Sequence, residues 1–306
     1  MTTLVFGHKS PDTDSTGSPI IWAWYLNEIK GVAAAPALLG EPNTEALFML
    51  DHWKLDKPQI IDDVQADQPV VIVDTNNPAE LPASINDANI TAIIDHHRLV
   101  GGLETKGPVN IVMETLACTA TIMYKMIGDD MAQMPENIKG AMLTCILSDT
   151  LEFRSPTTTQ EDTAIAHALA KDLGVDIAEY AAQMFAAKSD VSSFSEAELL
   201  RMDSKEYEVD GKKFRVSVLE TTSPATVLNR KDALMAAMPG VATEDGADQV
   251  LLFVVDILNE EATMLIPNDF TKSVAEKSFG ATVTGDSVVL PGVMSRKKQI
   301  IPNIKA

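Results

Sequence analysis

This 306-residue chain has only two cysteines, Cys118 and Cys145, and both lie in apolar stretches expected to be helical. Two such residues cannot form the disulfide framework of a small secreted domain. The first residues lack the basic and apolar regions of a secretory signal peptide, and no apolar run is long enough to cross a bilayer. We therefore expect a cytoplasmic protein without a membrane partner.

Basic residues are scarce, because 24 Lys and Arg stand against 44 Asp and Glu, which gives a formal net charge of −20. A nucleic-acid-binding surface needs clustered cations, so this balance argues against a nucleic-acid partner. The same charge repels an anionic substrate unless local cations or bound metal ions attract it. Aromatic residues make up only 5% of the chain and apolar residues 45%, which indicates an aliphatic core.

Segments typical of strands and helices alternate over the first part of the chain, which predicts an α/β domain with a doubly wound, mostly parallel sheet. The expected strands lie at 3–6, 34–39, 59–61, 70–74 and 91–95. The expected helices lie at 15–30, 43–53, 115–127, 136–148, 161–173 and 176–187.

A polar, serine-rich stretch at 188–195 is interpreted as a linker between a first domain, 1–187, and a second domain, 196–306. Beyond it, Asp210-Gly211 predicts a tight hairpin turn. The pattern indicates a smaller α+β domain with a mixed sheet. Its expected elements are strands at 206–209, 214–219, 249–257, 262–266 and 287–290, and helices at 224–238 and 269–278.

Side chains of metal-binding types occur where three expected strands end. Because the carboxyl ends of parallel strands meet at one edge of the sheet, we expect these side chains to gather where open α/β sheets bind ligands. Mixed carboxylate and imidazole ligands are typical of a binuclear metal centre. The side chains are His8, Asp12 and Asp14 after strand 3–6, Asp74 at the end of strand 70–74, and Asp95, His96 and His97 at the end of strand 91–95.

Each carboxylate taken alone has a simpler explanation. Asp14 or Ser15 could cap the following helix, and Asp74 could be a turn residue. Asp149 follows the expected helix 136–148, where the helix dipole opposes a negative charge. A bound metal would compensate this charge, and a plain exposed helix end is the alternative.

The adjacent His96 and His97 are harder to explain as turn residues. Neighbouring side chains point in different directions, so one imidazole can bind a metal while the other meets a substrate. An imidazole with a pKa of about 6.5 can also donate a proton at neutral pH. His52 and His167 lie in expected helices, and we interpret both as ordinary helix residues.

The densest basic cluster of this acidic chain is Arg296-Lys297-Lys298, which follows an expected strand and the turn Pro291-Gly292. Arginine binds phosphate oxygens in a bidentate manner and lysine supplies a mobile point charge. A solvated tail is the alternative interpretation of such a run. Lys205, just before the expected hairpin, carries no signal by itself.

Together these motifs closely resemble the family II inorganic pyrophosphatases of the DHH phosphoesterase superfamily, over essentially the whole chain. The first and last motifs are the specific ones, because Asp-His-His is shared with many relatives. The matching motifs are GHKSPDTDS at 7–15, with Ser10 where Asn is frequent, then Val73-Asp74, Asp95-His96-His97, Ser148-Asp149 and SRKKQ at 295–299.

The resemblance implies specific roles for these residues. One metal ion would be held by His8, Asp12 and Asp74, and a second by Asp14, Asp74, His96 and Asp149, with Asp74 bridging the two. Binding of the diphosphate and catalysis would fall to His97, Lys205, Arg296 and Lys297, of which Lys205 rests on a weaker local match.

The resemblance also implies the general properties of the family. These are a DHH domain followed by a DHHA2-type domain, with an active site between them, and hydrolysis of diphosphate to two phosphates by a metal-bridging hydroxide. Two Mn²⁺ or Co²⁺ ions would be bound per subunit, and additional Mg²⁺ or Mn²⁺ would arrive with pyrophosphate. Many family members form homodimers, here expected through the N-terminal domain.

Two alternatives remain open at this point. The first is another DHH phosphoesterase, of the nanoRNase or exonuclease type, although the glycine-rich Gly-Gly-Gly-His motif typical of those enzymes is missing here. The second is a non-catalytic module that binds metal or polyphosphate, which would not need every matched ligand position.

Overall fold

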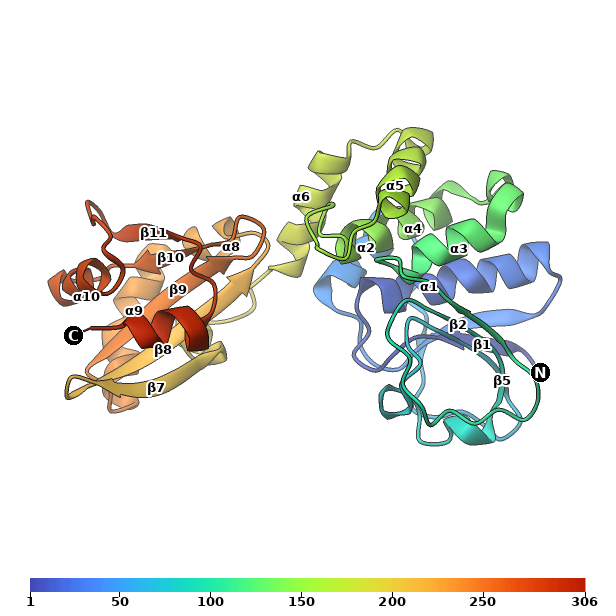
Figure 1. The fold of residues 1–306 in the computed structure, drawn as a ribbon, viewed down its shortest axis with the longest axis horizontal. Helices are drawn as coiled ribbons and strands as arrows, with labels where there is room; N and C mark the ends of the chain where they lie inside the picture. The colour runs from blue at the N-terminus through green and yellow to red at the C-terminus, as the bar shows by residue number, and fades with distance from the viewer. Residues whose placement is uncertain (306) are drawn as a thin grey trace. The chain divides into compact units, whose positions relative to one another are not determined.

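The computed structural model describes residues 1–305, which form two compact units, the first Met1–Ala187 and the second beginning at Lys188. Figure 1 shows the first unit in blue to yellow-green and the second in yellow to red. Each unit has its own sheet and core. Among the described residues, no helix is long and apolar enough to span a bilayer.

A six-stranded sheet forms the centre of the first unit, in the order β3-β2-β1-β4-β5-β6 with every neighbouring pair parallel. The expected parallel α/β sheet is therefore confirmed. Strand order reverses between β1 and β4, and ligands of open α/β sheets bind at such a point. The strands are β1 Thr3–Phe6, β2 Ala34–Leu38, β3 Gln59–Ile60, β4 Pro69–Val73, β5 Asn89–Asp95 and β6 Asn110–Met113.

Strand β6 was not expected from the sequence. Its four residues are exposed or half-buried at the edge of the sheet, so no buried apolar run marks it. An edge strand can fold with apolar side chains on only one face. The central strands β1 and β4, in contrast, are almost wholly buried and therefore have nearly continuous apolar sequences.

Six α-helices belong to this unit and lie close to their expected positions. The expected helix 15–30 is α1 continued by a π-helical turn. Asp12, rather than Asp14 or Ser15, is the N-cap of α1, because its Oδ1 accepts from the Ser15 amide at 2.9 Å. The helices are α1 Thr13–Trp24, α2 Thr44–His52, α3 Thr119–Ile127, α4 Glu136–Asp149, α5 Gln160–Leu173 and α6 Ile177–Lys188, with shorter turns at Tyr25–Ile29, Pro78–Glu80, Ile85–Asp87 and Gly128–Gln133.

Gly17 lets α1 approach α4 closely. A β-carbon at this position would lie 2.3 Å from the Cys145 sulfur and 3.3 Å from the Met49 sulfur. Gly17→Ala should therefore lower the free energy of unfolding by about 1–3 kcal/mol, because the buried core has no room to adjust. Urea denaturation measures this change.

The matched control for this prediction is Gly240→Ala. Gly240 also lies inside a helix, but a β-carbon added there would meet no heavy atom within 4 Å. Alanine should raise stability at this position by up to about 1 kcal/mol through its helix propensity. Equal stabilisation by both substitutions would contradict the close approach of α1 and α4.

The second unit contains a five-stranded sheet in the order β11-β10-β9-β8-β7. Only β8 and β9 run parallel, and the other pairs are antiparallel, so the expected mixed sheet is confirmed. Asp210 and Gly211 both have positive φ, 52° and 72°, as a two-residue hairpin turn requires. The strands are β7 Ser204–Val209, β8 Lys212–Thr221, β9 Gln249–Asp256, β10 Glu261–Leu265 and β11 Ser287–Pro291.

Both faces of this sheet are buried at its central strand, β9. Along β9, Leu251 and Phe253 pack into one core cluster, whereas Val250 and Leu252 pack into the other, because successive side chains of a strand alternate. The structure divides the expected helix 224–238 into α8 and α9, and it adds α7, which was not expected. The helices are α7 Glu196–Met202, α8 Ala225–Leu228, α9 Lys231–Glu244 and α10 Asp269–Phe279, followed by turns at Arg296–Ile300 and Ile301–Asn303.

Candidate metal centre

The carboxyl ends of β1, β4 and β5 carry the candidate ligands of the first unit. His8 follows β1, Asp74 follows β4, and His96 follows β5. Asp74 adopts a left-handed backbone conformation with φ of 57°, which turns the chain out of the strand. Parallel pairing of these three strands therefore brings the side chains to one edge of the sheet.

Asp74 lies at the centre of the cluster and is 1% exposed. Its Oδ2 is 3.4 Å from His8 Nε2, and its Oδ1 is 3.3 Å from His96 Nε2 and 3.7 Å from His97 Nδ1. Asp12 Oδ2 lies 3.6 Å from His8 Nε2. Both oxygens of one carboxylate thus face different imidazoles.

Three groups of side chains present one ligand atom each within 4.8 Å of one another. Asp74 belongs to two of these groups and His96 also belongs to two, so the three groups form one continuous cluster. All six side chains expected to bind metal are present in it. The groups are His8, Asp12 and Asp74; Asp14, His96 and Asp149; and Asp74, His96 and His97.

The cluster fits divalent cations by its electrostatics. Asp149 Oδ2 is buried and has no hydrogen-bond partner among residues 1–305, although it is grouped with Asp14 and His96. The carboxylates of Asp14 and Asp149 repel each other at this distance unless a cation lies between them. The mixed oxygen and nitrogen ligands, without thiolate, suit Mn²⁺.

The carboxylates perturb the imidazoles strongly. Burial by itself lowers the pKa of His8, but the carboxylates of Asp12 and Asp74 outweigh it and raise this pKa to about 11. Burial likewise lowers the pKa of His96, yet Asp74 and Asp14 raise it to about 9. Without metal, both imidazoles therefore carry protons at neutral pH.

The pKa values of the two acids grouped with His96, Asp14 and Asp149, are raised as well. Burial and the charge of Asp74 raise the pKa of Asp14 to about 6. Burial, followed by the charges of Asp14 and Asp74, raises the pKa of Asp149 well above its usual range. The metal-free site therefore lowers its excess negative charge by binding protons.

Mn²⁺ affinity should increase as the pH rises from about 6 to about 8, because a cation must displace these protons before it meets its ligands. The pKa values of His8 and His96 lie above this range, at about 11 and about 9, so each bound proton weakens binding as the pH falls. We expect at least about a tenfold gain in affinity per pH unit. Calorimetric titration of the metal-stripped chain at several pH values measures it, and pH-independent affinity would contradict the prediction.

His97 has a different environment from His96. The Asp95 carboxylate, 0% exposed, accepts hydrogen bonds from the His97 amide at 3.0 Å and from its Nδ1 at 2.9 Å. The hydrogen bond with Asp95 raises the pKa of His97. Burial alone would raise the pKa of Asp95, but the hydrogen bonds from His97 and Asn76 lower it. The His97 ring is thereby oriented by Nδ1, while its side chain remains 53% exposed.

A cavity of about 440 Å³ adjoins the cluster, lined in part by His8 and His97. Lys9 and Arg98 also line it and bring positive charge to this side of the site. Sequence reasoning did not select these two residues. Their positions directly after His8 and His97 are the signal that could have identified them.

The three expected phosphate-binding cations lie in the second unit and line one cavity of about 710 Å³ there. Lys205 comes from β7, and Arg296 and Lys297 come from the turn after β11. The Arg296 guanidinium donates to the Asp203 carbonyl at 2.8 Å and pairs with the Asp203 carboxylate at 2.8 Å. Asp203 therefore holds Arg296 in place at the wall of this cavity.

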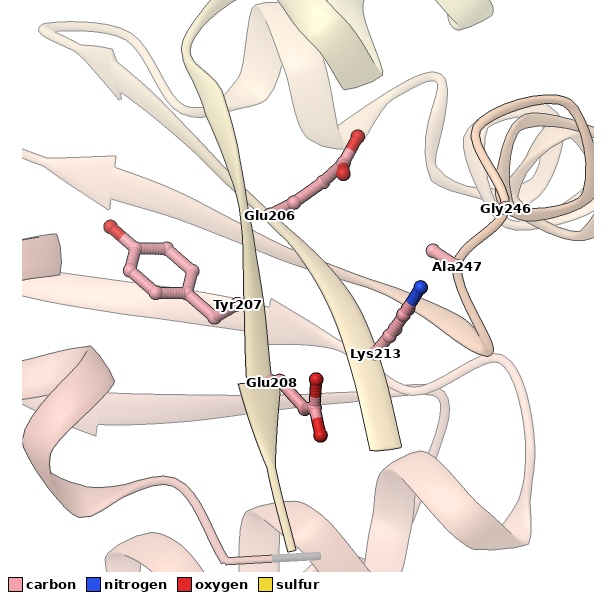
Figure 2. A pocket seen from close by; sticks show the side chains of 6 residues that line it. All are labelled: Glu206, Tyr207, Glu208, Lys213, Gly246 and Ala247. Atoms are coloured by element: carbon pink, nitrogen blue, oxygen red, sulfur yellow. The ribbon is translucent and has the colours of Figure 1, made fainter. Parts of the chain in front are cut away.

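Strand alternation explains which side chains of β7 reach this cavity. Figure 2 shows Glu206 and Glu208 on one face of the hairpin, where they border a small pocket with Lys213, and Tyr207 pointing to the opposite side. Lys205 and Tyr207 share a face because they are two residues apart. Both line the 710 Å³ cavity, whereas the acids of β7 point away from it.

Comparison with known proteins agrees with this geometry. Residues 2–149 match the DHH family, N-terminal domain, and residues 182–306 match the DHHA2 domain. A "Probable manganese-dependent inorganic pyrophosphatase" from Lactobacillus acidophilus is 36% identical over 301 residues, which cover 98% of this chain and 96% of the relative. The chain belongs to this pyrophosphatase family. A relative of the same name from Deinococcus radiodurans is 39% identical over 307 residues, covering 98% of this chain and 97% of its own.

Two solved structures are similar to this chain in fold. A Methanococcus jannaschii protein assigned to the family II inorganic pyrophosphatases superposes with a TM-score of 0.61 at 30% identity, covering 99% of this chain and 98% of that one. An exopolyphosphatase-related protein from Bacteroides fragilis superposes with a TM-score of 0.53 at 12% identity, covering 98% of this chain and 89% of that one. The second similarity shows a shared fold alone.

Proposed function

We propose that this chain is a manganese-dependent inorganic pyrophosphatase, which hydrolyses diphosphate to two phosphates. The observation that carries the proposal is the position of Asp74, whose two oxygens face His8 on one side and His96 on the other. Its family relatives are named for this activity. A carboxylate shared in this way is suited to bridging two cations.

The ligands divide into two sets around Asp74. We assign one Mn²⁺ to His8, Asp12 and Asp74, and the other to Asp14, Asp74, His96 and Asp149. Bound divalent ions of this kind supply a nucleophile from water at neutral pH and polarise phosphoryl oxygens. Co²⁺ suits the same ligands, and further Mg²⁺ or Mn²⁺ is proposed to enter with the substrate.

The other residues of the proposed site act on the substrate itself. His97 is oriented by Asp95, whose hydrogen bond also raises its pKa, and it donates a proton from Nε2 to the departing phosphate. We assign the cavity of Lys205, Arg296 and Lys297 to the phosphate groups of the same substrate. These three cations neutralise phosphoryl oxygens as negative charge shifts between them.

The test is an assay of phosphate release. The chain is stripped of metal with a chelator and then supplied separately with Mn²⁺, Co²⁺, Mg²⁺ or Zn²⁺. We expect pyrophosphate hydrolysis to return with Mn²⁺ or Co²⁺, and a short oligonucleotide to remain uncleaved. Oligonucleotide cleavage without pyrophosphate hydrolysis would favour another phosphoesterase, and metal binding without either reaction would favour a binding module.

We further propose a homodimer formed through the first unit, in the cytoplasm. Strand β6 lies at the edge of its sheet, and its Ile111 is 53% exposed to solvent. The same strand of a second copy could pair with this edge. Cys118 and Cys145 are both free and buried, which suits a reducing compartment. Sedimentation analysis of the full chain tests the dimer.

A further inference from the structure

The segment Leu116–Thr119 contacts several candidate metal ligands from outside the cluster. The Leu116 carbonyl accepts from His96 Nδ1 at 3.2 Å. The Thr119 amide donates to Asp14 Oδ2 at 2.7 Å, and the Thr119 hydroxyl donates to Asp74 Oδ1 at 3.3 Å. The segment therefore orients three of the side chains that we assign to one cation.

These contacts restrict how the ligands can turn. A hydrogen bond from Nδ1 to the Leu116 carbonyl directs His96 Nε2 toward Asp74. The Thr119 amide belongs to the first turn of α3, where the helix dipole favours the negative charge of Asp14. The ligands are thus held before any cation binds.

His8 and Asp12 are held by a different part of the chain. The His8 amide donates to the Ser15 hydroxyl at 2.8 Å, and Asp12 Oδ1 accepts from the Ser15 amide at 2.9 Å. Of the three contacts that Leu116–Thr119 makes with candidate ligands, only the one with Asp74, the longest at 3.3 Å, involves a ligand that both sets share. The two proposed cation positions therefore have separate supports.

A single buried carboxylate anchors Leu116–Thr119. Asp162 is 0% exposed, and its oxygens accept from the Ala117 amide at 3.1 Å and from the Thr121 hydroxyl at 2.7 Å. The same carboxylate accepts from the Thr159 amide at 2.9 Å and hydroxyl at 2.7 Å, which closes the capping box of α5. A buried carboxylate whose donors are all in place is costly to displace.

We infer that Asp162 is a positioning residue for the cation held by Asp14, Asp74, His96 and Asp149, and not for the one held by His8 and Asp12. It acts through Leu116–Thr119, without touching a ligand of either cation. The inference rests on the proposed two-cation function. Residues that orient metal ligands in this way typically contribute about 10–100-fold to metal affinity.

The test measures Mn²⁺ binding rather than turnover. The full chain is stripped of metal and titrated with MnCl₂ by calorimetry in two backgrounds. His8→Ala leaves the cation position that includes Asp14 and His96. Asp149→Ala leaves the cation position that includes His8 and Asp12. Asp162→Ala should weaken the binding that remains in the His8→Ala chain by about 10–100-fold. It should change the binding that remains in the Asp149→Ala chain by less than about threefold, because only the long Asp74 contact is shared.

A milder variant and a matched control accompany this test. Thr121→Val removes one hydrogen bond to Asp162. It should weaken Mn²⁺ binding in the His8→Ala background by a few-fold, the effect expected from the loss of one hydrogen bond. If Asp162→Ala does not fold, as judged by circular dichroism, Thr121→Val decides the question. Glu198→Ala removes the acid of the equivalent capping box on α7 in the second unit and should leave both Mn²⁺ affinities unchanged.

Each outcome decides the inference. Weakening confined to the His8→Ala background supports it. Equal weakening of Mn²⁺ binding in both backgrounds shows general loosening of the fold and overturns the inference. Unchanged affinities in Asp162→Ala overturn it too, or in Thr121→Val where Asp162→Ala fails to fold. Absence of any Mn²⁺ binding by the unsubstituted chain overturns the proposed function together with the inference.

Discussion

Asp74→Asn should lower Mn²⁺-supported pyrophosphate hydrolysis by at least about a thousandfold, equivalent to about 4 kcal/mol of transition-state stabilisation. The Asp74 carboxylate faces His8 and His96 with different oxygens, so one substitution affects both proposed cation positions. Asparagine keeps the shape of the side chain but lacks the charge and one of the two acceptor oxygens. Phosphate release and bound manganese, measured on the same samples, should fall together.

Asparagine is the informative substitution because Asp74 has a φ of 57°. Asparagine tolerates this left-handed conformation, whereas alanine would add backbone strain to the loss of a ligand. Asp67→Asn is the matched control, since Asp67 has a φ of 62° and a side chain that is 74% exposed. It should retain full activity. Near-normal turnover by Asp74→Asn would rule out the bridging role.

Arg296→Ala should reduce kcat/KM for pyrophosphate by about 10²–10³-fold, equivalent to about 3–4 kcal/mol, while Mn²⁺ content stays unchanged. The guanidinium lines the cation cavity of the second unit and is fixed by Asp203 through two contacts of 2.8 Å. A preorganised guanidinium stabilises phosphoryl charge more effectively than a mobile one. Steady-state kinetics with manganese analysis separates this effect from metal loss.

Lys298→Ala provides the control for this second prediction. Lys298 lies in the same turn, Arg296–Ile300, but its side chain is exposed and is not among the residues that line the cavity. It should leave kcat/KM within about twofold, as expected for an exposed charge. An equal loss in both variants would indicate long-range attraction of the substrate rather than a specific contact by Arg296.

Short-range patterns predicted most of the regular structure. Buried β-branched runs identified β1, β4 and β5, and the Asp-Gly pair identified the turn between β7 and β8. The failures have a common cause. Strand β6 lies at a sheet edge and α7 is a short helix, so neither has the long buried pattern that periodicity detects.

The candidate ligands could be selected from the sequence because metal-binding side chains follow directly after buried strands. Closeness in the sequence alone placed Asp12 near Asp14 and His96 near His97. Asp149 was harder to identify as a metal ligand from the sequence, since a carboxylate at a helix end has ordinary explanations. Its Oδ2 atom is buried without a partner where α4 packs against α1, and no local pattern contains this packing.

By itself, the sequence determined the types of side chain available, their order along the chain and the strands after which they appear, because these depend on neighbouring residues. The tertiary structure alone decided that Asp74 faces His8 and His96, that Asp203 holds Arg296, and that Asp162 anchors Leu116–Thr119. These contacts join residues far apart in sequence. They exist only because strand pairing and helix packing bring distant segments within hydrogen-bonding distance, and local propensity carries no information about such distances.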